Sequence, residues 1–355
     1  MMPARATVSL DEFLHDGARF SALLDARSES EFADDHLPGA INVPVLNDLE
    51  RAEVGTLYKQ VSPFDARRRG AALVARNIAA FIEGELAGRP RDWAPLVYCW
   101  RGGERSAALT HVLARVGWRA RQLEGGYRAY RRHVVQALAE LPSRFELRVV
   151  CGKTGSGKSR LLQQLAQAGA QVLDLEHLAH HRGSVLGGFP ALPQPSQKTF
   201  ETRIWSALRG LSTDLPVFVE SESRKVGDLR VPDGLILAMR AASCIAIEVP
   251  TAERVKLLRD EYEHLERSPE QLAAQLDCLA PLHGRERVEQ WKALADGGRW
   301  DELVERLLVE HYDPAYQRSI NRNFTRIDGA RVLTIVEGTR DAFASAARAL
   351  ASGSA

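Results

Sequence analysis

Residues 147–166 read LRVVCGKTGSGKSRLLQQLA, and this stretch decides the fold of the second half of the chain. Its apolar start, 147–151, predicts a strand, and the leucine spacing over 160–168 predicts an amphipathic helix. The glycine-rich loop between them satisfies the Walker A pattern, in which backbone amides wrap phosphate groups and a lysine reaches their terminal oxygens. The residues expected to bind phosphate are Gly152, Thr154, Gly155, Ser156, Gly157, Lys158 and Ser159. Strand, loop and helix in this order predict an α/β domain that binds a di- or triphosphate.

The segments after this loop alternate between strand and helix patterns. Strands are expected at 171–175, 217–220 and 244–249, and a helix at 199–211. This alternation predicts a P-loop NTPase-like, doubly wound domain over 145–250. From Thr251 the pattern turns mostly helical, with a late strand at 332–336. Residues 251–355 are therefore expected to form a mostly helical region that packs on the P-loop domain.

The first part of the chain shows a similar alternation. Short strands are expected at 20–25, 95–99 and 121–123, and helices at 71–86 and 106–116. The sequence Leu141-Pro142-Ser143-Arg144 breaks a helix shortly before the strand that begins at Leu147. We therefore expect a separate first domain over 1–140, which makes the whole chain an α/β protein.

Composition excludes several classes of protein. The chain has 355 residues, with 47 Lys plus Arg against 46 Asp plus Glu, so a uniformly basic nucleic-acid-binding protein is excluded but a local basic face is not. The four cysteines are widely spaced, which argues against a secreted disulfide framework. Apolar runs are of strand length, whereas a membrane helix needs about 20 residues. We expect a cytoplasmic, reduced protein with no membrane partner.

A second anion-binding loop lies about fifty residues before the first and reads CWRGGERS, residues 99–106. A cysteine at the end of a strand, followed by a glycine turn and a helix start, meets backbone N–H groups that stabilise a thiolate. Cys99 is the expected nucleophile, and Arg105 and Arg101 are expected to hold an oxyanion beside it. The rest of the anion loop is expected to comprise Trp100, Gly102, Gly103 and Ser106.

This first domain resembles the rhodanese family. The resemblance rests on three stretches: Leu24-Asp25-Ala26-Arg27, residues 36–42 (HLPGAIN) and the Cys99–Ser106 loop. It departs from the family at one point, since the sulfurtransferase loop has one residue fewer between the cysteine and its arginine. The wider loop is similar to that of rhodanese-fold phosphatases. It implies room for a larger tetrahedral anion, such as a phosphate-bearing chalcogen donor.

Several polar residues are expected beside the P-loop without a fixed role. These are Asp174, Glu176, Arg182, Ser184, Glu220 and Arg224. No acidic residue stands in an unambiguous metal-assisting position, which favours a diphosphate ligand over a triphosphate, although the Ser159 hydroxyl could hold magnesium. His177, His180 and His181 could imitate a metal cluster, but no cysteine accompanies them.

Basic and aromatic residues could form an RNA-binding surface. The basic clusters are Arg67-Arg68-Arg69 and Arg128 with Arg131-Arg132-His133. A mixed set near the end of the chain comprises Tyr312, Asp313, Tyr316, Arg318, Asn321 and Arg322. This mixed set suits base stacking and phosphate contacts, but it could equally pack the helical region against the P-loop domain.

The order rhodanese-like domain, P-loop domain and helical region resembles the tRNA 2-selenouridine synthase family over nearly the whole chain. The residues that carry the resemblance are 98–106, 152–159, 174–184 (DLEHLAHHRGS) and 220–224 (ESESR). The resemblance implies replacement of sulfur by selenium at the 2-thiouridine wobble base of tRNA, with selenophosphate as donor. It also implies an S-geranyl intermediate made from geranyl diphosphate. The implied partners are tRNA and the enzyme that produces selenophosphate, with no tightly bound cofactor.

Two other functions remain open from the residues alone. The wider cysteine loop and the Walker A loop also fit a rhodanese-fold phosphatase fused to an ATP-dependent kinase. A non-catalytic, nucleotide-gated tRNA-binding protein is the third alternative. Hydrolysis of phosphate esters without tRNA would indicate the phosphatase–kinase fusion. Normal function in cells after loss of Cys99 would indicate the non-catalytic tRNA-binding protein.

Overall fold

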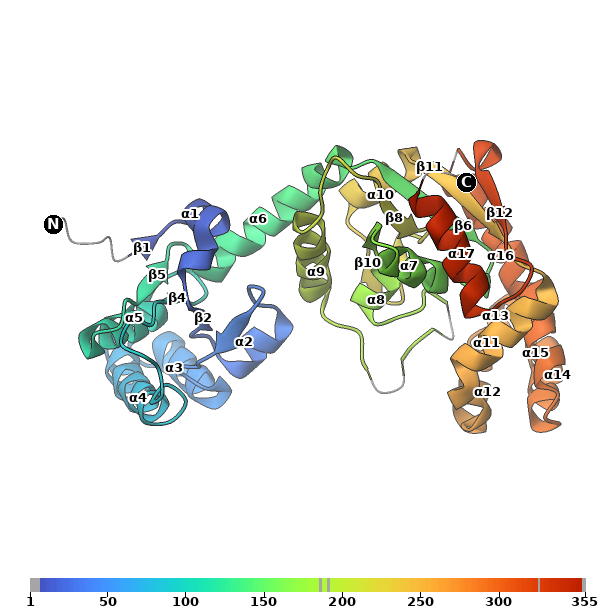
Figure 1. Cartoon of the computed structure of the whole chain (residues 1–355). Helices are drawn as coiled ribbons and strands as arrows, with labels where there is room; N and C mark the ends of the chain where they lie inside the picture. The colour runs from blue at the N-terminus through green and yellow to red at the C-terminus, as the bar shows by residue number, and fades with distance from the viewer. Residues whose placement is uncertain (1–6, 185–186, 190–191, 325, 353–355) are drawn as a thin grey trace. The chain divides into compact units, whose positions relative to one another are not determined.

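The structure, a computed structural model, describes residues 7–184, 187–189, 192–324 and 326–352. The chain divides into two compact units, residues 1–137 and 138–355. Within the described residues, each unit contains a five-stranded parallel sheet with helices around it (Figure 1). The α/β class expected from the alternating pattern is confirmed.

The sheet of the first unit has the order β1-β5-β4-β2-β3. The strands are β1 (Thr7–Val8), β2 (Ala22–Asp25), β3 (Ala40–Asn42), β4 (Pro95–Tyr98) and β5 (Arg121–Leu123). The helices are α1 (Leu10–Asp16), α2 (Glu29–Asp34), α3 (Asp48–Gln60), α4 (Pro63–Glu83), α5 (Glu104–Val116) and α6 (Gly126–Glu140). Residues of β2, β4, α4 and α5 share one apolar core that includes Leu24, Val97 and Leu109. This packing places the end of the central strand β4, where the cysteine loop begins, over the core.

A buried ion pair supports the end of β2. Asp25 and Arg27 are 0% and 1% exposed, and the Arg27 Nη2–Asp25 Oδ2 distance is 2.6 Å. Arg27 also donates to the Asp35 carbonyl at 2.6 Å, and its guanidinium lies 4.0 Å from the ring centroid of Tyr127. These contacts join β2, the end of α2 and the first turn of α6. Both residues belong to the sequence pattern that resembles rhodanese.

We expect Arg27→Ala to destabilise the first unit by about 3–5 kcal/mol, because it leaves the buried Asp25 carboxylate without its partner. Urea denaturation followed by circular dichroism measures the change. Arg68→Ala is the matched control, since Arg68 is 75% exposed and pairs with Asp65 on its own helix. Equal effects of the two substitutions would contradict the stabilising role of the buried pair.

The sheet of the second unit has the order β12-β11-β6-β8-β7, with all pairs parallel. Its strands are β6 (Leu147–Gly152), β7 (Gln171–Leu173), β8 (Val217–Glu220), β11 (Ser243–Glu248) and β12 (Arg331–Thr334). Helices α7 (Lys158–Gln167), α8 (Leu175–Ala179), α9 (Gln197–Arg209) and α10 (Asp233–Ala241) follow its strands, and β9 (Lys225–Val226) and β10 (Leu229–Arg230) form a small antiparallel ladder. The P-loop strand β6 is therefore central.

The region after residue 250 is mostly helical but returns to the sheet. It contains α11 (Thr251–Glu266), α12 (Pro269–Asp277), α13 (Ala280–His283), α14 (Arg285–Asp296), α15 (Trp300–Leu307), a π-helix (Leu308–Tyr312), α16 (Asp313–Asn323) and α17 (Arg340–Ala351). Strand β12 pairs with β11, and Phe343 and Leu350 of α17 share a core with Leu161 and Leu165 of α7. The end of the chain is thus part of the P-loop unit.

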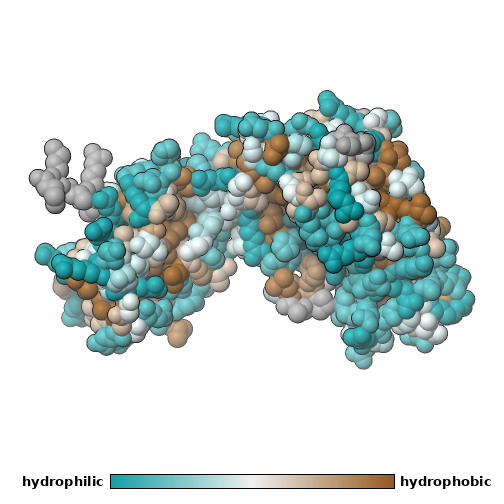
Figure 2. Space-filling view, viewed as in Figure 1, coloured by the Kyte–Doolittle hydropathy of each residue, from teal (hydrophilic) through white to brown (hydrophobic). Residues whose placement is uncertain are grey.

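The helical layer α11 to α15 is amphipathic. Its buried side chains, including Leu265, Leu276, Trp291 and Leu303, form one apolar cluster. The face of this layer seen in Figure 2 is mostly hydrophilic. The buried apolar residues of these helices are therefore turned toward one another, whereas Leu282 of α13 is 72% exposed. Across the described part of the chain, no helix combines the length and the hydropathy needed to cross a membrane.

Candidate functional site

The nucleophile expected from the cysteine loop lies where β4 meets α5. Cys99 follows the last residue of β4, is 3% exposed, and lies one turn before the start of α5 at Glu104. The Ser106 hydroxyl donates to the Cys99 sulfur at 3.0 Å, and Gln122 Nε2 donates to the Ser106 oxygen and to the Gly102 carbonyl, each at 2.8 Å. Sequence reasoning missed Gln122, which lies on the neighbouring strand β5. The sulfur is thus positioned at a helix N-terminus, where partial positive charge stabilises an anion.

The floor of this loop is formed by the start of α6. The backbone N–H groups of Tyr127 and Arg128 donate to the carbonyls of Cys99 and Trp100, both at 2.9 Å. Gly126 has φ +54°, and a Cβ atom there would stand 2.2 Å from the Cys99 carbonyl oxygen. Only glycine fits this approach without displacing the loop. The start of α6 therefore fixes the backbone at Cys99 and Trp100 through two hydrogen bonds and close packing.

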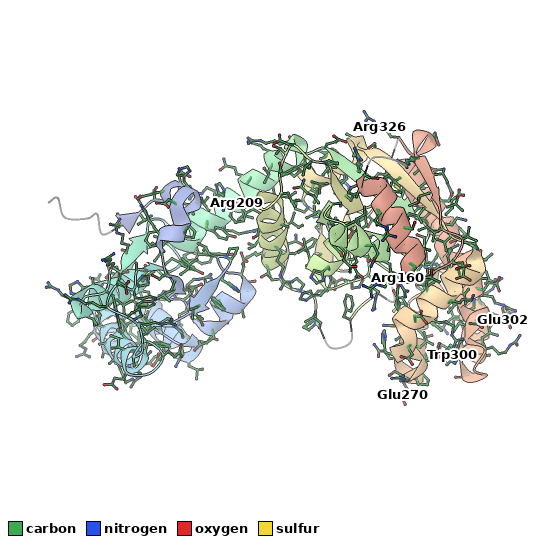
Figure 3. All side chains as sticks on the ribbon, in the orientation of Figure 1. Arg160, Arg209, Glu270, Trp300, Glu302 and Arg326 are labelled. Carbon is green, nitrogen blue, oxygen red and sulfur yellow. The ribbon has the colours of Figure 1, made fainter. Side chains whose placement is uncertain are left out.

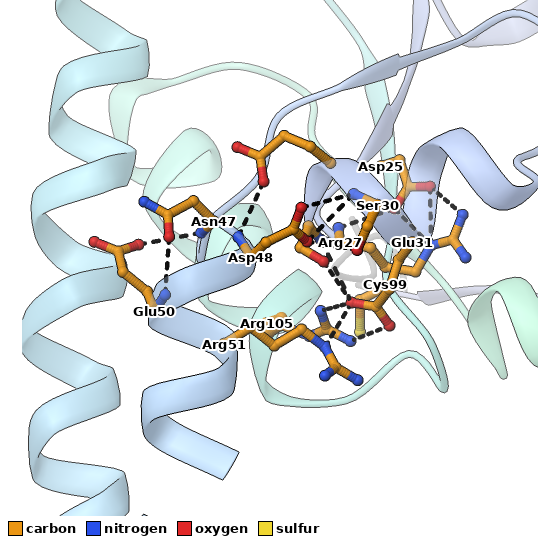
Figure 4. Close-up of polar contacts among 12 residues, drawn as sticks. Asp25, Arg27, Ser30, Glu31, Asn47, Asp48, Glu50, Arg51, Cys99 and Arg105 are labelled. Carbon is orange, nitrogen blue, oxygen red and sulfur yellow. Dashed lines mark hydrogen bonds and ion pairs between the residues drawn. The ribbon is translucent and has the colours of Figure 1, made fainter. Parts of the chain in front are cut away.

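Arg105, expected to clamp an oxyanion, is held by a carboxylate. Its Nη1 lies 2.6 Å from Glu31 Oε2, and Arg51 Nε lies 2.8 Å from the same oxygen, so two guanidinium groups converge on one carboxylate (Figure 4). Burial alone would raise the pKa of Glu31, but the hydrogen bond and charge of Arg105, with the charge of Arg51, lower it below its ordinary value. An anion near Cys99 would compete with Glu31 for Arg105. Arg101 is exposed at the loop surface, and Trp100 is 37% exposed.

The P-loop of the second unit joins β6 to α7. Gly157, the N-cap of α7, has φ +73°, and a Cβ atom there would stand 2.3 Å from the Phe343 ring of α17. The first N–H groups of this ten-residue helix are free of intrahelical partners and suit phosphate oxygens. Lys158 Nζ donates to the Gly152 carbonyl at 3.1 Å. The Lys158 side chain thus lies across the loop and is hydrogen-bonded to its first residue.

A pocket of about 300 Å³ opens beside this loop. Of the expected phosphate-binding residues, those that line it are Thr154, Gly155, Gly157, Lys158 and Ser159. Glu176, Arg182 and Ser184, which were expected beside the P-loop, also line it. Gly152 and Ser156 line a different cavity on the other side of the loop. Glu222 also lines the first pocket and lies in the 220–224 stretch singled out from the sequence, whereas sequence reasoning missed the contributions of Leu258, Glu261 and Tyr262, which come from distant segments.

Arg182 brings a positive charge to this pocket. Its guanidinium lies 4.3 Å from the ring centroid of Phe189 and 5.0 Å from that of Tyr262, which fixes it by cation–π contacts. Its Nη1 atom is buried and has no hydrogen-bond partner among the described residues. With Lys158, this arginine supplies two cations for a polyanion.

Helix α16 braces the P-loop. Arg254 Nε donates to the Thr154 carbonyl at 2.9 Å, and its Nη2 lies 2.6 Å from Asp313 Oδ1. Lys153 Nζ pairs with the same carboxylate at 3.4 Å. Tyr312 and Tyr316 line the anion pocket. The set of aromatic and polar residues near the end of the chain could either bind RNA or pack against the P-loop domain. For Asp313, the structure shows packing against the P-loop domain.

Carboxylates gather at the other side of the pocket. The Ser159 hydroxyl donates to Glu176 Oε2 at 2.6 Å, and the Glu176 backbone N–H donates to Glu220 Oε1 at 2.7 Å. Burial, reinforced by neighbouring carboxylates, raises the pKa of Glu222 to about 8 and that of Glu220 well above its usual range. The raised pKa values favour the protonated, neutral forms of these two groups, which lowers their repulsion toward a polyanion.

We expect Glu222→Gln to flatten the pH dependence of stability. The pKa of Glu222 is about 8 in the folded chain and about 4.5 in the unfolded chain. Between pH 4.5 and pH 8, the folded chain therefore keeps a proton on Glu222 that the unfolded chain has lost. The stability that this proton contributes is complete below pH 4.5 and is lost as pH rises toward 8 and beyond, by roughly 1–3 kcal/mol. Thermal unfolding between pH 5 and 9 measures it, with the exposed Glu263→Gln as control. Parallel curves for wild type and Glu222→Gln would contradict the expectation.

Three residues expected beside the P-loop do not line the pocket: Asp174, Glu220 and Arg224. Asp174 caps α8 by accepting from the His177 N–H at 2.8 Å, Glu220 is 1% exposed, and Arg224 is exposed. Among the three histidines, His180 contacts the Pro193 carbonyl and Arg203, and His181 accepts from the Gly183 N–H. Within the described ranges, no three His, Cys, Asp or Glu side chains are grouped as metal ligands. Arg68 and Arg69 of the first basic cluster pair with Asp65 and Glu53.

Comparisons with known proteins match a different family model to each of the two compact units. Residues 8–133 match the family described as rhodanese-like domain, and residues 145–281 match the tRNA 2-selenouridine synthase AAA domain. A tRNA 2-selenouridine synthase from Hydrogenovibrio crunogenus is 31% identical over 336 residues, covering 86% of this chain and 91% of that protein. Its counterpart from Bdellovibrio bacteriovorus is 31% identical over 365 residues, covering 90% and 92%. The one from Nitrosomonas europaea is 36% identical over 251 residues, covering 68% of this chain and 63% of that protein.

Proposed function

The chain belongs to the tRNA 2-selenouridine synthase family, and from this premise we propose that it exchanges sulfur for selenium at the 2-thiouridine wobble base of tRNA in two steps. The observation that carries the proposal is the presence of two anion sites of different chemistry on one chain. One offers the Cys99 sulfur at the start of a helix, and the other offers backbone amides with two cations. A single-step exchange would need only one of them.

The first step is geranylation of the base sulfur at the P-loop pocket. The diphosphate of geranyl diphosphate lies against the α7 N-terminus, Lys158 and Arg182. The thiouridine sulfur attacks the allylic carbon, the carbon–oxygen bond breaks, and pyrophosphate leaves with the electron pair while the base loses its ring N–H proton. Cations around the leaving group stabilise the charge that develops on it. The sulfur thereby becomes part of a thioether, which is a better leaving group.

A magnesium ion fits the same pocket. The Ser159 hydroxyl and the Glu176 carboxylate are hard oxygen donors beside the phosphate-binding loop, and magnesium binds through one or two carboxylates together with substrate phosphates. The ion would supply further neutralisation of the diphosphate. Glu176 and Ser159 would then exchange their mutual hydrogen bond for coordination.

The second step is delivery of selenium at the cysteine loop. The Cys99 thiolate attacks the phosphorus of selenophosphate, the phosphorus–selenium bond breaks, and selenide leaves with its electrons. Selenide attacks the base carbon that carries the geranyl thioether, and geranyl thiol leaves after it takes up a proton. Water then hydrolyses the phosphocysteine and releases phosphate. Arg105 and Arg101 hold the phosphoryl oxygens, which suits the wide loop.

The partners implied are tRNA and the enzyme that makes selenophosphate. Selenide and selenophosphate are readily oxidised, so transfer directly between proteins would protect them. The tRNA must present its wobble base to both anion sites in turn.

Mass spectrometry of nucleosides tests this function. Thiouridine-containing tRNA is incubated with the protein and geranyl diphosphate, with and without magnesium, and selenophosphate is added afterwards. We expect geranylthiouridine in the first stage, more of it with magnesium, and selenouridine in the second. Phosphate-ester or ATP hydrolysis without either nucleoside would favour the phosphatase and kinase alternative.

A further inference from the structure

A second cavity adjoins the anion pocket, inside the helical region. It has a volume of about 70 Å³ and is lined almost entirely by carbon atoms. Its apolar walls come from α11, α12, α15 and the π-helix, through Leu265, Leu272, Leu303, Leu307 and Leu308. Five residues line both this cavity and the anion pocket: Thr154, Ser184, Leu258, Tyr262 and Tyr312. The two spaces therefore meet at one shared wall.

We propose that this cavity binds the hydrocarbon chain of a prenyl diphosphate whose diphosphate lies on the P-loop, and that Leu303 limits the length of the chain. The proposal rests on the function proposed for the P-loop pocket and adds the residues that recognise the apolar part of its substrate. An apolar cavity beside an anion site suits a ligand with one charged end and one hydrocarbon end. Each methylene group that leaves water contributes about 0.8 kcal/mol to binding.

The junction between the two spaces has the few polar groups that such a ligand needs. The Ser184 hydroxyl and the Tyr262 hydroxyl lie 3.2 Å apart. Tyr262 has non-helical backbone angles, φ −115° and ψ 19°, which mark a kink in α11. The junction thus places hydroxyl groups where the chain meets its diphosphate.

The size of the cavity limits what enters it. At about 70 Å³ it is roughly half the volume of an apolar cavity that accepts benzene. One terminal prenyl unit fits after small movements, while the preceding unit lies at the junction. A geranyl chain satisfies this arrangement, and a farnesyl chain carries one unit too many.

The position of Leu303 makes it the residue to test. It is 2% exposed and lies on α15, the helix that begins at Trp300, labelled in the helical layer in Figure 3. Leu294 of α14 belongs to the same apolar cluster and is 5% exposed, but it does not line the cavity. The two leucines form a matched pair, because truncation of either one removes the same atoms from the same core.

The experiment measures transfer of dimethylallyl, geranyl and farnesyl groups to thiouridine-containing tRNA by the full chain. We expect Leu303→Ala to raise the ratio of farnesyl to geranyl transfer about tenfold, and Leu294→Ala to leave it unchanged. Leu303→Phe, which fills the cavity and leaves no void, should lower geranyl transfer about tenfold while dimethylallyl transfer persists. Inhibition by inorganic pyrophosphate should be the same in all variants, since the anion site is intact.

The possible results separate the two proposals. Wild-type protein that transfers no prenyl group would overturn the proposed function and this inference with it. Wild-type protein that geranylates tRNA, with unchanged donor ratios in both Leu303 variants, would overturn only the inference. Equal shifts in Leu303→Ala and Leu294→Ala would also overturn it, because a general loosening of the core would then explain the change.

Discussion

Cys99→Ser protein should geranylate tRNA normally and yet form selenouridine at least about 100-fold more slowly than wild type. The hydroxyl of serine does not ionise near neutral pH, so the loop keeps its shape but loses its nucleophile. The P-loop pocket lies in the other compact unit and keeps all of its residues. Geranylthiouridine should therefore accumulate.

Single-turnover reactions with tRNA that is already geranylated measure the second step alone. Cys278→Ser is the control, because Cys278 is the exposed cysteine outside both sites. Phosphocysteine trapped by acid quenching of the wild-type reaction would identify the covalent step directly. Selenouridine formation by Cys99→Ser at the normal rate would exclude the nucleophilic role.

Lys158→Ala protein should show the opposite pattern. We expect geranylation to fall about 100- to 1,000-fold, because the substitution removes a cation from the leaving diphosphate. Conversion of geranylated tRNA to selenouridine should stay within about twofold of wild type, since the cysteine loop is untouched. The loss should appear mainly in kcat if the charge acts on the transition state.

The same nucleoside mass spectrometry measures both steps of this variant. Lys256→Ala is the control, since Lys256 is 70% exposed and pairs with Glu253 on its own helix. A variant that loses both steps together would indicate that the P-loop gates the whole reaction, and the assignment of one step to each site would then be wrong.

Much of the fold could be predicted from local sequence. Strands β5 and β8 begin and end at the residues expected, and β6, β7, β11 and β12 differ by only one or two residues at an end. Buried parallel strands are short apolar runs between breaks, so their pattern is strong. Helix α3 was missed because none of its residues is buried, which removes the apolar periodicity. The capping box formed by Asn47 and Glu50 was the signal that could have found it.

The site was predictable only where it is contiguous. Both anion loops could be located because strand, loop and helix are adjacent in sequence. Their partners come from far along the chain: Glu31 is 74 residues from Arg105, and Arg254 is 100 residues from Thr154. Leu258 and Tyr262 reach the P-loop pocket through tertiary packing, for which one sequence carries no local signal, whereas Glu222 lies in the 220–224 stretch that the sequence singles out. The catalytic roles of Cys99 and Lys158 stay predictions until the variants are measured.

The close approach of Gly126 to the cysteine loop also restricts how this enzyme can change over generations. A Cβ atom at position 126 would lie 2.2 Å from the Cys99 carbonyl oxygen and 2.6 Å from the Gly102 nitrogen, so any other residue there would displace the loop. Trp100 and Arg101 are exposed and have no such constraint. Natural variants, and any laboratory library that seeks a different chalcogen donor, should therefore keep glycine at position 126.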